Sequence, residues 1–105
     1  MFLLCIYVPD SHLGKVKDAV FDAGGGRIGD YDRCAWQVKG EGQFRPLVQA
    51  TPYIGECGQS EVVVEYKLEV VVADTLIKPV IEAMKSAHPY EEPAFHYMKV
   101  NPTIE

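Results

Sequence analysis

The chain has 105 residues, 48% of them hydrophobic, with 10 Lys and Arg residues against 15 Asp and Glu residues. This length predicts a single domain over residues 1–105, which buries roughly two thirds of the surface that the unfolded chain exposes. The net charge of -5 and the absence of a basic cluster argue against nucleic acid and anionic membrane as partners. The three cysteines are odd in number and widely spaced, which indicates reduced thiols in the cytoplasm rather than a disulfide framework.

The first segments of the chain predict a strand followed by a helix. Residues 1–8 are a continuous apolar run that stops at Pro9 with no basic residue before it, so we expect a buried strand and not a signal peptide. From Ser11 onward, apolar residues recur at helical spacing up to three glycines at 24–26, which we expect to end the helix. No run approaches the ~20 apolar residues of a membrane helix.

The middle of the chain predicts a projecting pair of strands. Residues 34–39 alternate between apolar and polar side chains, and residues 40–42 (Gly-Glu-Gly) have the composition of a hairpin turn into residues 43–47. Residues 50–59 are rich in turn-forming residues and also contain Tyr53 and Ile54. We expect this loop to cover a site or a neighbouring subunit.

The second half of the chain predicts a long strand, a helix and a last strand. Residues 61–73 alternate, so that the even-numbered apolar positions form a buried face and the odd-numbered face is mostly solvated at its start. Asp74 is a good N-cap for a helix that continues to Ala87. Pro79 lies inside this pattern, so the helix either begins nearer Leu76 or is slightly bent. The last strand is expected at residues 94–100.

This order of elements predicts an α+β fold. Strand, helix, strand with an extra hairpin, strand, helix and strand is the ferredoxin-like split βαβ arrangement, in which four antiparallel strands carry two helices on one face. The other face of the sheet is then free in a two-layer domain. We expect oligomerisation through that face or through the sheet edges.

The segment His88-Pro89-Tyr90-Glu91-Glu92-Pro93 concentrates ionisable side chains between two prolines. Proline disfavours the helical conformation in the residue before it, so His88 should end the helix and the next residues should form a short, stiff turn. One histidine and two carboxylates could bind a cation, relay a proton or form an oligomer contact. The sequence leaves these three roles open.

Each role has a simpler structural interpretation. His88 at a helix C-terminus is favoured by the helix dipole, worth typically 0.3–1 kcal/mol, without any ligand. Glu91 and Glu92 point to opposite faces if the turn is extended, which argues against a two-carboxylate acid/base pair. A metal site therefore needs a further ligand, and the candidates from loops or another subunit are His12, Cys34, Glu41, Glu56 and Cys57.

Three motifs resemble a known family. Residues 40–46 (GEGQFRP), residues 52–55 (PYIG) and residues 87–92 (AHPYEE) occur in the order and spacing of the inserted middle domain of bacterial YqfO proteins, in the NIF-three-like group. Residues 8–13 and 23–29 fit the same domain, so the resemblance covers nearly the whole chain. The chain contains no counterpart of the flanking halves, which hold the dimetal site of the family, so the resemblance implies no hydrolase activity.

The resemblance implies a fold and a class of function. The inserted domain is similar in fold to CutA and PII proteins, which form trimers of ferredoxin-like subunits. Likeness to CutA implies association with a divalent metal, the candidate cofactor, and likeness to PII implies small-molecule sensing. A separate NIF-three-like protein that carries the missing halves is a candidate partner.

Two hypotheses for the function follow. The preferred one is a non-catalytic oligomeric binding module, a trimer that holds a metal ion or small metabolite at a subunit boundary. The alternative is a small metal-dependent hydrolase whose site is shared between subunits. The expected ligand-binding residues are His88, Tyr90, Glu91, Glu92, Tyr53 and Phe44, and the expected metal ligands are His88, Glu91 and Glu92.

Overall fold

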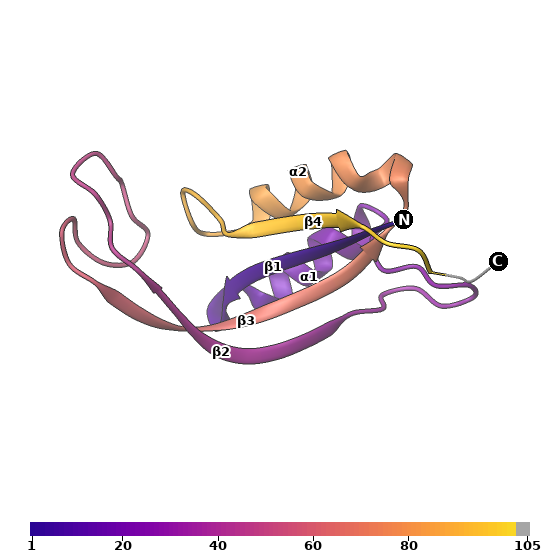
Figure 1. Cartoon of the computed structure of the whole chain (residues 1–105), viewed down its shortest axis with the longest axis horizontal. Helices are drawn as coiled ribbons and strands as arrows, with labels where there is room; N and C mark the ends of the chain where they lie inside the picture. The colour runs from indigo at the N-terminus through magenta and orange to yellow at the C-terminus, as the bar shows by residue number, and fades with distance from the viewer. Residues whose placement is uncertain (103–105) are drawn as a thin grey trace.

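Four strands and two helices form the two layers of the molecule in a computed structural model that describes residues 1–102. In chain order the elements are β1 (Phe2–Pro9), η1 (Asp10–His12), α1 (Leu13–Asp22), β2 (Trp36–Phe44), β3 (Glu61–Val72), η2 (Asp74–Leu76), α2 (Ile77–Ala87) and β4 (Phe95–Lys99). The strands form one antiparallel sheet in the order β2-β3-β1-β4 (Figure 1). The predicted ferredoxin-like α+β fold is confirmed.

The hydrophobic core lies between the two α helices and one face of β1 and β3. Leu4 of β1 is the partner of Val70 on β3, and Ile6 is the partner of Leu68, so apolar side chains from both strands point toward the helices. Each core side chain contributes about 1.5–3 kcal/mol by leaving water. The core residues, none more than 2% exposed, are Leu4, Ile6, Val8, Val16, Val20, Leu68, Val70, Val72, Val80 and Met84.

The bounds of the two α helices follow from the hydrogen bonds available to the backbone groups at their ends. The N–H group of Gly24, at φ +107°, donates to the carbonyl of Phe21, which closes the end of α1 as predicted from the glycines. α2 begins at Ile77, which confirms the start near Leu76. Pro79 is therefore the third residue of α2, within the first turn, where the N–H group that proline lacks has no helical partner.

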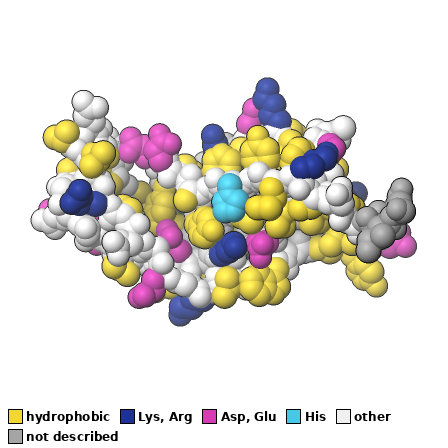
Figure 2. All heavy atoms as spheres, in the orientation of Figure 1, with side chains coloured by type: hydrophobic (Ala, Val, Ile, Leu, Met, Phe, Trp, Pro, Cys, Tyr) yellow, Lys and Arg dark blue, Asp and Glu magenta, His cyan; other side chains and the backbone are white. Residues whose placement is uncertain are grey.

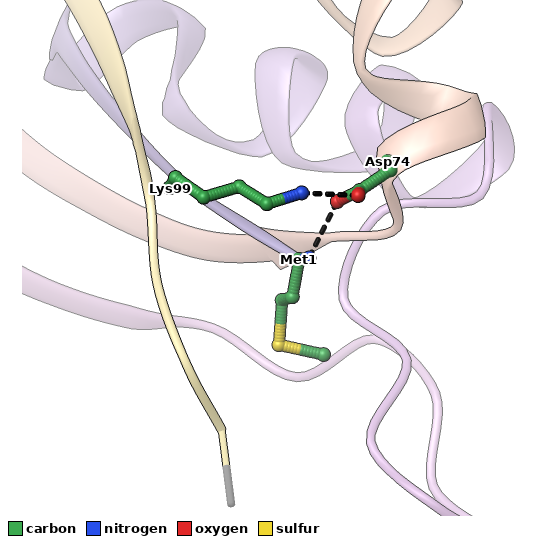
Figure 3. A network of polar contacts seen from close by, with 3 residues as sticks. All are labelled: Met1, Asp74 and Lys99. Atoms are coloured by element: carbon green, nitrogen blue, oxygen red, sulfur yellow. Dashed lines mark hydrogen bonds and ion pairs between the residues drawn. The ribbon is translucent and has the colours of Figure 1, made fainter.

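The predicted N-cap role of Asp74 is wrong. In the part of the chain that the structure describes, no side chain caps η2 or α2. The Asp74 carboxylate instead accepts hydrogen bonds from the Lys99 ammonium group and from the α-ammonium group of Met1 (Figure 3). The hydrogen bond from Lys99 is the main reason why the pKa of Asp74 is lowered. The contacts link the start of η2 to the ends of β1 and β4.

The predicted hairpin at residues 40–42 is also wrong. β2 continues through these residues, and Gly40 and Gly42 lie opposite Glu65 and Val63 of β3. The twelve-residue β3 provides backbone partners along the whole of β2, so the glycines stay in the ladder and do not reverse the chain. The reversal occurs in the loop of residues 45–60.

The outer halves of β2 and β3 extend beyond the body as an arm, which we define as residues 40–65 (Figure 1). Pairing of β1 with β3 ends at Glu65, and Val62 and Val64 are 60% and 45% exposed. The expected continuous buried face of β3 is therefore confirmed only for its inner half. The molecule measures 50 × 23 × 23 Å because of this arm.

The face of the sheet opposite the helices is uncovered. Trp36, Val38 and Met98 lie on this face and are 60%, 44% and 47% exposed. Figure 2 shows hydrophobic side chains gathered over the strands, with a few charged groups among them. Within residues 1–102, no helix has the length and apolar character needed to cross a membrane.

Candidate ligand-binding cavity

A cavity of about 380 Å³ lies between the arm and the turn of residues 88–94. This volume is within the range of small-molecule sites. In Figure 1 the end of the arm lies opposite the turn between α2 and β4. The lining residues are Gln43, Phe44, Arg45, Pro46, Leu47, Ala50, Pro52, Tyr53, Ile54, Glu65, Tyr90, Glu91, Glu92 and Ala94.

The three motifs of the sequence meet at this cavity. Residues 43–46 line it from the end of β2, residues 52–54 from the loop of the arm, and residues 90–92 from the turn after α2. These segments are separate in the chain and become neighbours through the fold. The loop thus covers the cavity, as expected for a turn-rich segment that contains Tyr53 and Ile54.

Five of the six expected ligand-binding residues line the cavity, namely Phe44, Tyr53, Tyr90, Glu91 and Glu92. The ring of Tyr90 lies between the other two aromatic rings, with centroid distances of 6.0 Å to Phe44 and 6.4 Å to Tyr53. The three rings therefore form an aromatic cluster that spans the arm and the turn.

The sixth residue, His88, lies behind the cavity and not on its surface. Its side chain is 7% exposed, and Nε2 lies 2.8 Å from the carbonyl oxygen of Tyr7. Nδ1 lies 3.2 Å from the backbone nitrogen of Tyr90 and accepts its N–H, so Nε2 carries the proton and donates to Tyr7. Both ring nitrogens are occupied.

The charge state of His88 follows from its burial. Burial lowers the pKa of this imidazole, and its hydrogen bond to Tyr7 and the nearby Glu65 carboxylate oppose that effect. The ring is therefore neutral at pH 7, which corrects the interpretation of His88 as a charged group at the helix dipole. Its backbone does end α2, with the extended conformation expected before Pro89.

The turn is attached at both ends to Tyr7 of β1. The Tyr7 carbonyl accepts from His88 at 2.8 Å, and the Tyr7 N–H donates to the carbonyl of Ala94 at 3.0 Å. A second contact joins the turn to the arm, because Oε2 of Glu91 accepts the backbone N–H of Thr51 at 3.0 Å. These contacts position the two sides of the cavity relative to each other.

The structure does not bring His88, Glu91 and Glu92 together as a metal site. Among residues 1–102 of one chain, no three His, Cys, Asp or Glu side chains are arranged to hold a metal ion. The physical reason is that His88 uses both ring nitrogens within the fold, and Glu91 is hydrogen-bonded to Thr51. The donor set among residues 1–102 does not fit the divalent metal implied by the resemblance to CutA.

Residues 90–92 form a bend and not an extended segment. Glu91 and Glu92 consequently both line the cavity, whereas an extended turn would have placed them on opposite faces. Alternation of side chains applies only to extended backbone, which is why the sequence pattern failed at this point.

Glu65 is a cavity residue that the sequence pattern did not reveal. It belongs to the odd-numbered face of β3, and its carboxylate lies over the backbone of Gly42, at 1.9 Å from where a Cβ there would lie. The sequence pointed to this position only through Gly40 and Gly42 on the neighbouring strand. A residue without a side chain leaves space that the side chain of a neighbouring residue, here Glu65, can occupy.

The hydroxyl of Tyr90 is buried without a hydrogen-bond partner among the described residues. Burial raises the pKa of this hydroxyl well above its usual range, and the Glu65 carboxylate, which lies beside the hydroxyl without the geometry of a complete hydrogen bond, raises it further. The hydroxyl is therefore protonated at all physiological pH values. A buried polar group without a partner is costly, and it remains available for a hydrogen bond.

The chain is similar in sequence to segments of longer proteins. No family model matches it. It is 48% identical over 97 residues to a protein of Mycobacterium leprae named GTP cyclohydrolase 1 type 2 homolog, covering 92% of this chain and 25% of that protein. A Bacillus subtilis protein of the same name is 44% identical over 100 residues, covering 95% and 27%. The chain spans about a quarter of the length of these curated relatives.

Solved structures show the same relationship and the same fold. A Bacillus cereus protein related to NIF3 matches with a TM-score of 0.77 and 38% identity, over 91% of this chain and 24% of that one. The PII-like protein CutA from Nostoc matches with a TM-score of 0.68 and 17% identity, over 96% and 82%. The chain is therefore similar in sequence to one segment of the GTP cyclohydrolase 1 type 2 homologs, and similar in fold to CutA.

Proposed function

We propose that the chain is a non-catalytic binding or regulatory module that holds a small metabolite in the cavity between the arm and the turn. The observation that carries this proposal is the convergence of three separate motifs on one cavity of about 380 Å³. Its lining combines aromatic and aliphatic walls with a few polar groups, which is typical of small-molecule sites. The chain corresponds in this proposal to the inserted middle domain of YqfO proteins and acts in the cytoplasm, where its three unpaired cysteines stay reduced.

The module assembles into a homotrimer in this proposal. Trp36, Val38 and Met98 support assembly because they expose large apolar side chains on the uncovered face of the sheet. Large apolar side chains exposed together on an uncovered face are typical of interaction sites. The subunit boundary lies close to the cavity in this proposal, and the chain has the same fold as the CutA and PII-like proteins. A separate NIF-three-like protein is the candidate partner.

The alternative of a metal-dependent hydrolase has no observation in its favour. The chain gathers no metal group among residues 1–102, and His88 is committed to the Tyr7 carbonyl. The binding module therefore explains more of the geometry, because it uses the residues that do line the cavity.

Native mass spectrometry tests assembly and binding in one experiment. The protein is recorded alone and with a mixture of amino acids, amines, nucleosides and nucleotides, after dialysis with and without zinc and manganese. We expect a trimer with a saturable organic adduct that Phe44→Ala removes. Tyr31→Ala is the control, because Tyr31 is 75% exposed and lies outside both the cavity and the uncovered face of the sheet, so its loss should leave the adduct in place. A bare monomer in every sample contradicts the proposal.

A further inference from the structure

We propose that the ligand of this cavity is an organic cation, a compact molecule with an ammonium group that lies between the aromatic rings and Glu65. This inference rests on the proposed function, because it names the class of ligand for the same cavity. Four observations carry it: the charge of the lining, the aromatic cluster, the Tyr90 hydroxyl and the position of the Glu65 carboxylate.

The lining of the cavity carries an excess of negative charge. Three carboxylates (Glu65, Glu91 and Glu92) and one guanidinium group (Arg45) line it. Glu65 forms no ion pair with any residue in the part of the chain that the structure describes. The charge of the lining favours a cation and disfavours phosphates and other anions.

The aromatic cluster adds attraction for a cation. Phe44, Tyr53 and Tyr90 lie with neighbouring centroids at 6.0 and 6.4 Å, all three on the lining of the cavity. The faces of aromatic rings carry negative potential, and recognition of quaternary ammonium groups by several rings is a common use of this property. A neutral apolar ligand lacks this electrostatic attraction, and the same rings would stabilise it only through the free energy of burying its apolar surface.

The Tyr90 hydroxyl and the Glu65 carboxylate define the polar end of the site. The hydroxyl is buried and has no partner within residues 1–102, so a ligand group can accept or donate a hydrogen bond there. The carboxylate lies over Gly42 because glycine has no side chain to displace it. A Cβ at Gly42 would come within 1.9 Å of Oε1 and 2.5 Å of Cδ, so any side chain there moves the carboxylate.

Choline and its neutral carbon isostere, in which a tert-butyl group replaces the trimethylammonium group, test the inference. Binding is followed by NMR through the ring resonances of Tyr53 and Tyr90. The two probes have nearly the same shape, so a difference in affinity reports the charge. We expect choline to bind about tenfold more tightly than the isostere.

Two matched pairs of variants locate the effect. Glu65→Gln should lower the affinity for choline about tenfold, whereas Glu41→Gln removes a carboxylate of the same arm that does not line the cavity and should leave it unchanged. Gly42→Ala should weaken choline binding by moving the Glu65 carboxylate without removing its charge. Gly40→Ala is its control, because a Cβ there meets no atom within 4 Å.

The outcomes separate this inference from the proposed function. Equal affinity for choline and its isostere, or tighter binding of AMP at the same tyrosines, overturns the organic cation and leaves a binding module. Unchanged choline binding in both Glu65→Gln and Gly42→Ala also overturns it. If choline, the isostere and AMP all fail to shift the cavity tyrosines, both the cation and the binding module are overturned.

Discussion

The Nε2 atom of His88 lies 2.8 Å from the carbonyl oxygen of Tyr7, although the two residues are 81 positions apart in the chain. Tyr7 also donates its N–H to Ala94, so one residue of β1 holds both ends of the turn that carries Tyr90. The second ring nitrogen of His88 accepts the N–H of Tyr90. His88 therefore acts as a positioning residue for the cavity and not as a group that contacts the ligand.

Replacing His88 with Ala should lower the free energy of unfolding by about 2 kcal/mol, because the Tyr7 carbonyl loses its partner in a buried site. Urea denaturation measures this change. His96→Ala is the control, since His96 is exposed on β4 and its loss should cost less than about 0.5 kcal/mol. Equal effects of the two substitutions would show that the bond to Tyr7 is unimportant for stability.

Stability should fall as the pH drops through the ordinary pKa of His88. Burial lowers the pKa of His88 below its usual 6.5, so below that value the unfolded chain binds the proton more readily than the folded chain. The stabilisation of the folded chain by neutral His88 is fully present above pH 6.5, and it is lost as the pH falls toward the pKa of His88 in the folded state. Urea midpoints at pH 7.5 and about 5.5 measure it.

His88→Gln provides the comparison for this pH dependence. The variant lacks the titrating imidazole, so its midpoint should change less between the two pH values than that of the unaltered chain. An identical loss of stability in both proteins would assign the effect to another group.

Replacing Tyr90 with Phe should leave the free energy of unfolding unchanged or raise it by up to about 1 kcal/mol, because a buried hydroxyl without a partner is removed. Thermal unfolding measures the change. Tyr53→Phe should have no effect, since Tyr53 is 55% exposed. A clear loss of stability in Tyr90→Phe would mean that the hydroxyl has a structural partner.

Replacing Glu91 with Ala should release the loop of the arm from the turn. Its carboxylate accepts the Thr51 N–H at 3.0 Å, so hydrogen exchange at the Thr51 amide should become faster. Glu92→Ala is the matched control, because Glu92 lines the same cavity from the next position. Equal exchange at Thr51 in both variants would contradict a specific role for Glu91.

Replacing Val38 with Glu should weaken the proposed trimer, because it puts a charge on the uncovered face of the sheet. Size-exclusion chromatography with light scattering follows the mass as the protein is diluted. Gln37→Glu adds the same charge to the opposite face of β2, where Lys17 donates to Gln37 at 3.0 Å, and it should leave assembly unchanged. Dissociation by both variants would place the interface elsewhere.

Local patterns were sufficient for most of the elements. The apolar run before Pro9, the glycines after Ala23 and the alternation after Glu61 each depend on neighbours in the chain, and each correctly predicted an element. The pattern failed at residues 40–42, where the Gly-Glu-Gly sequence is equally compatible with a turn and with a strand. β3 decided between them, because its backbone groups pair with both glycines.

Local sequence patterns predicted the fold class, because helix and strand periodicity and proline stops act over a few neighbouring residues, and the motifs predicted five of the fourteen residues that line the cavity. Three features emerge from long-range contacts: His88 supports the cavity from behind, Glu91 and Glu92 face it together, and Glu65 belongs to it. These outcomes depend on contacts such as His88 with Tyr7, whose partners are distant in the chain, and on the register between β2 and β3. No local pattern encodes the distance between such residues.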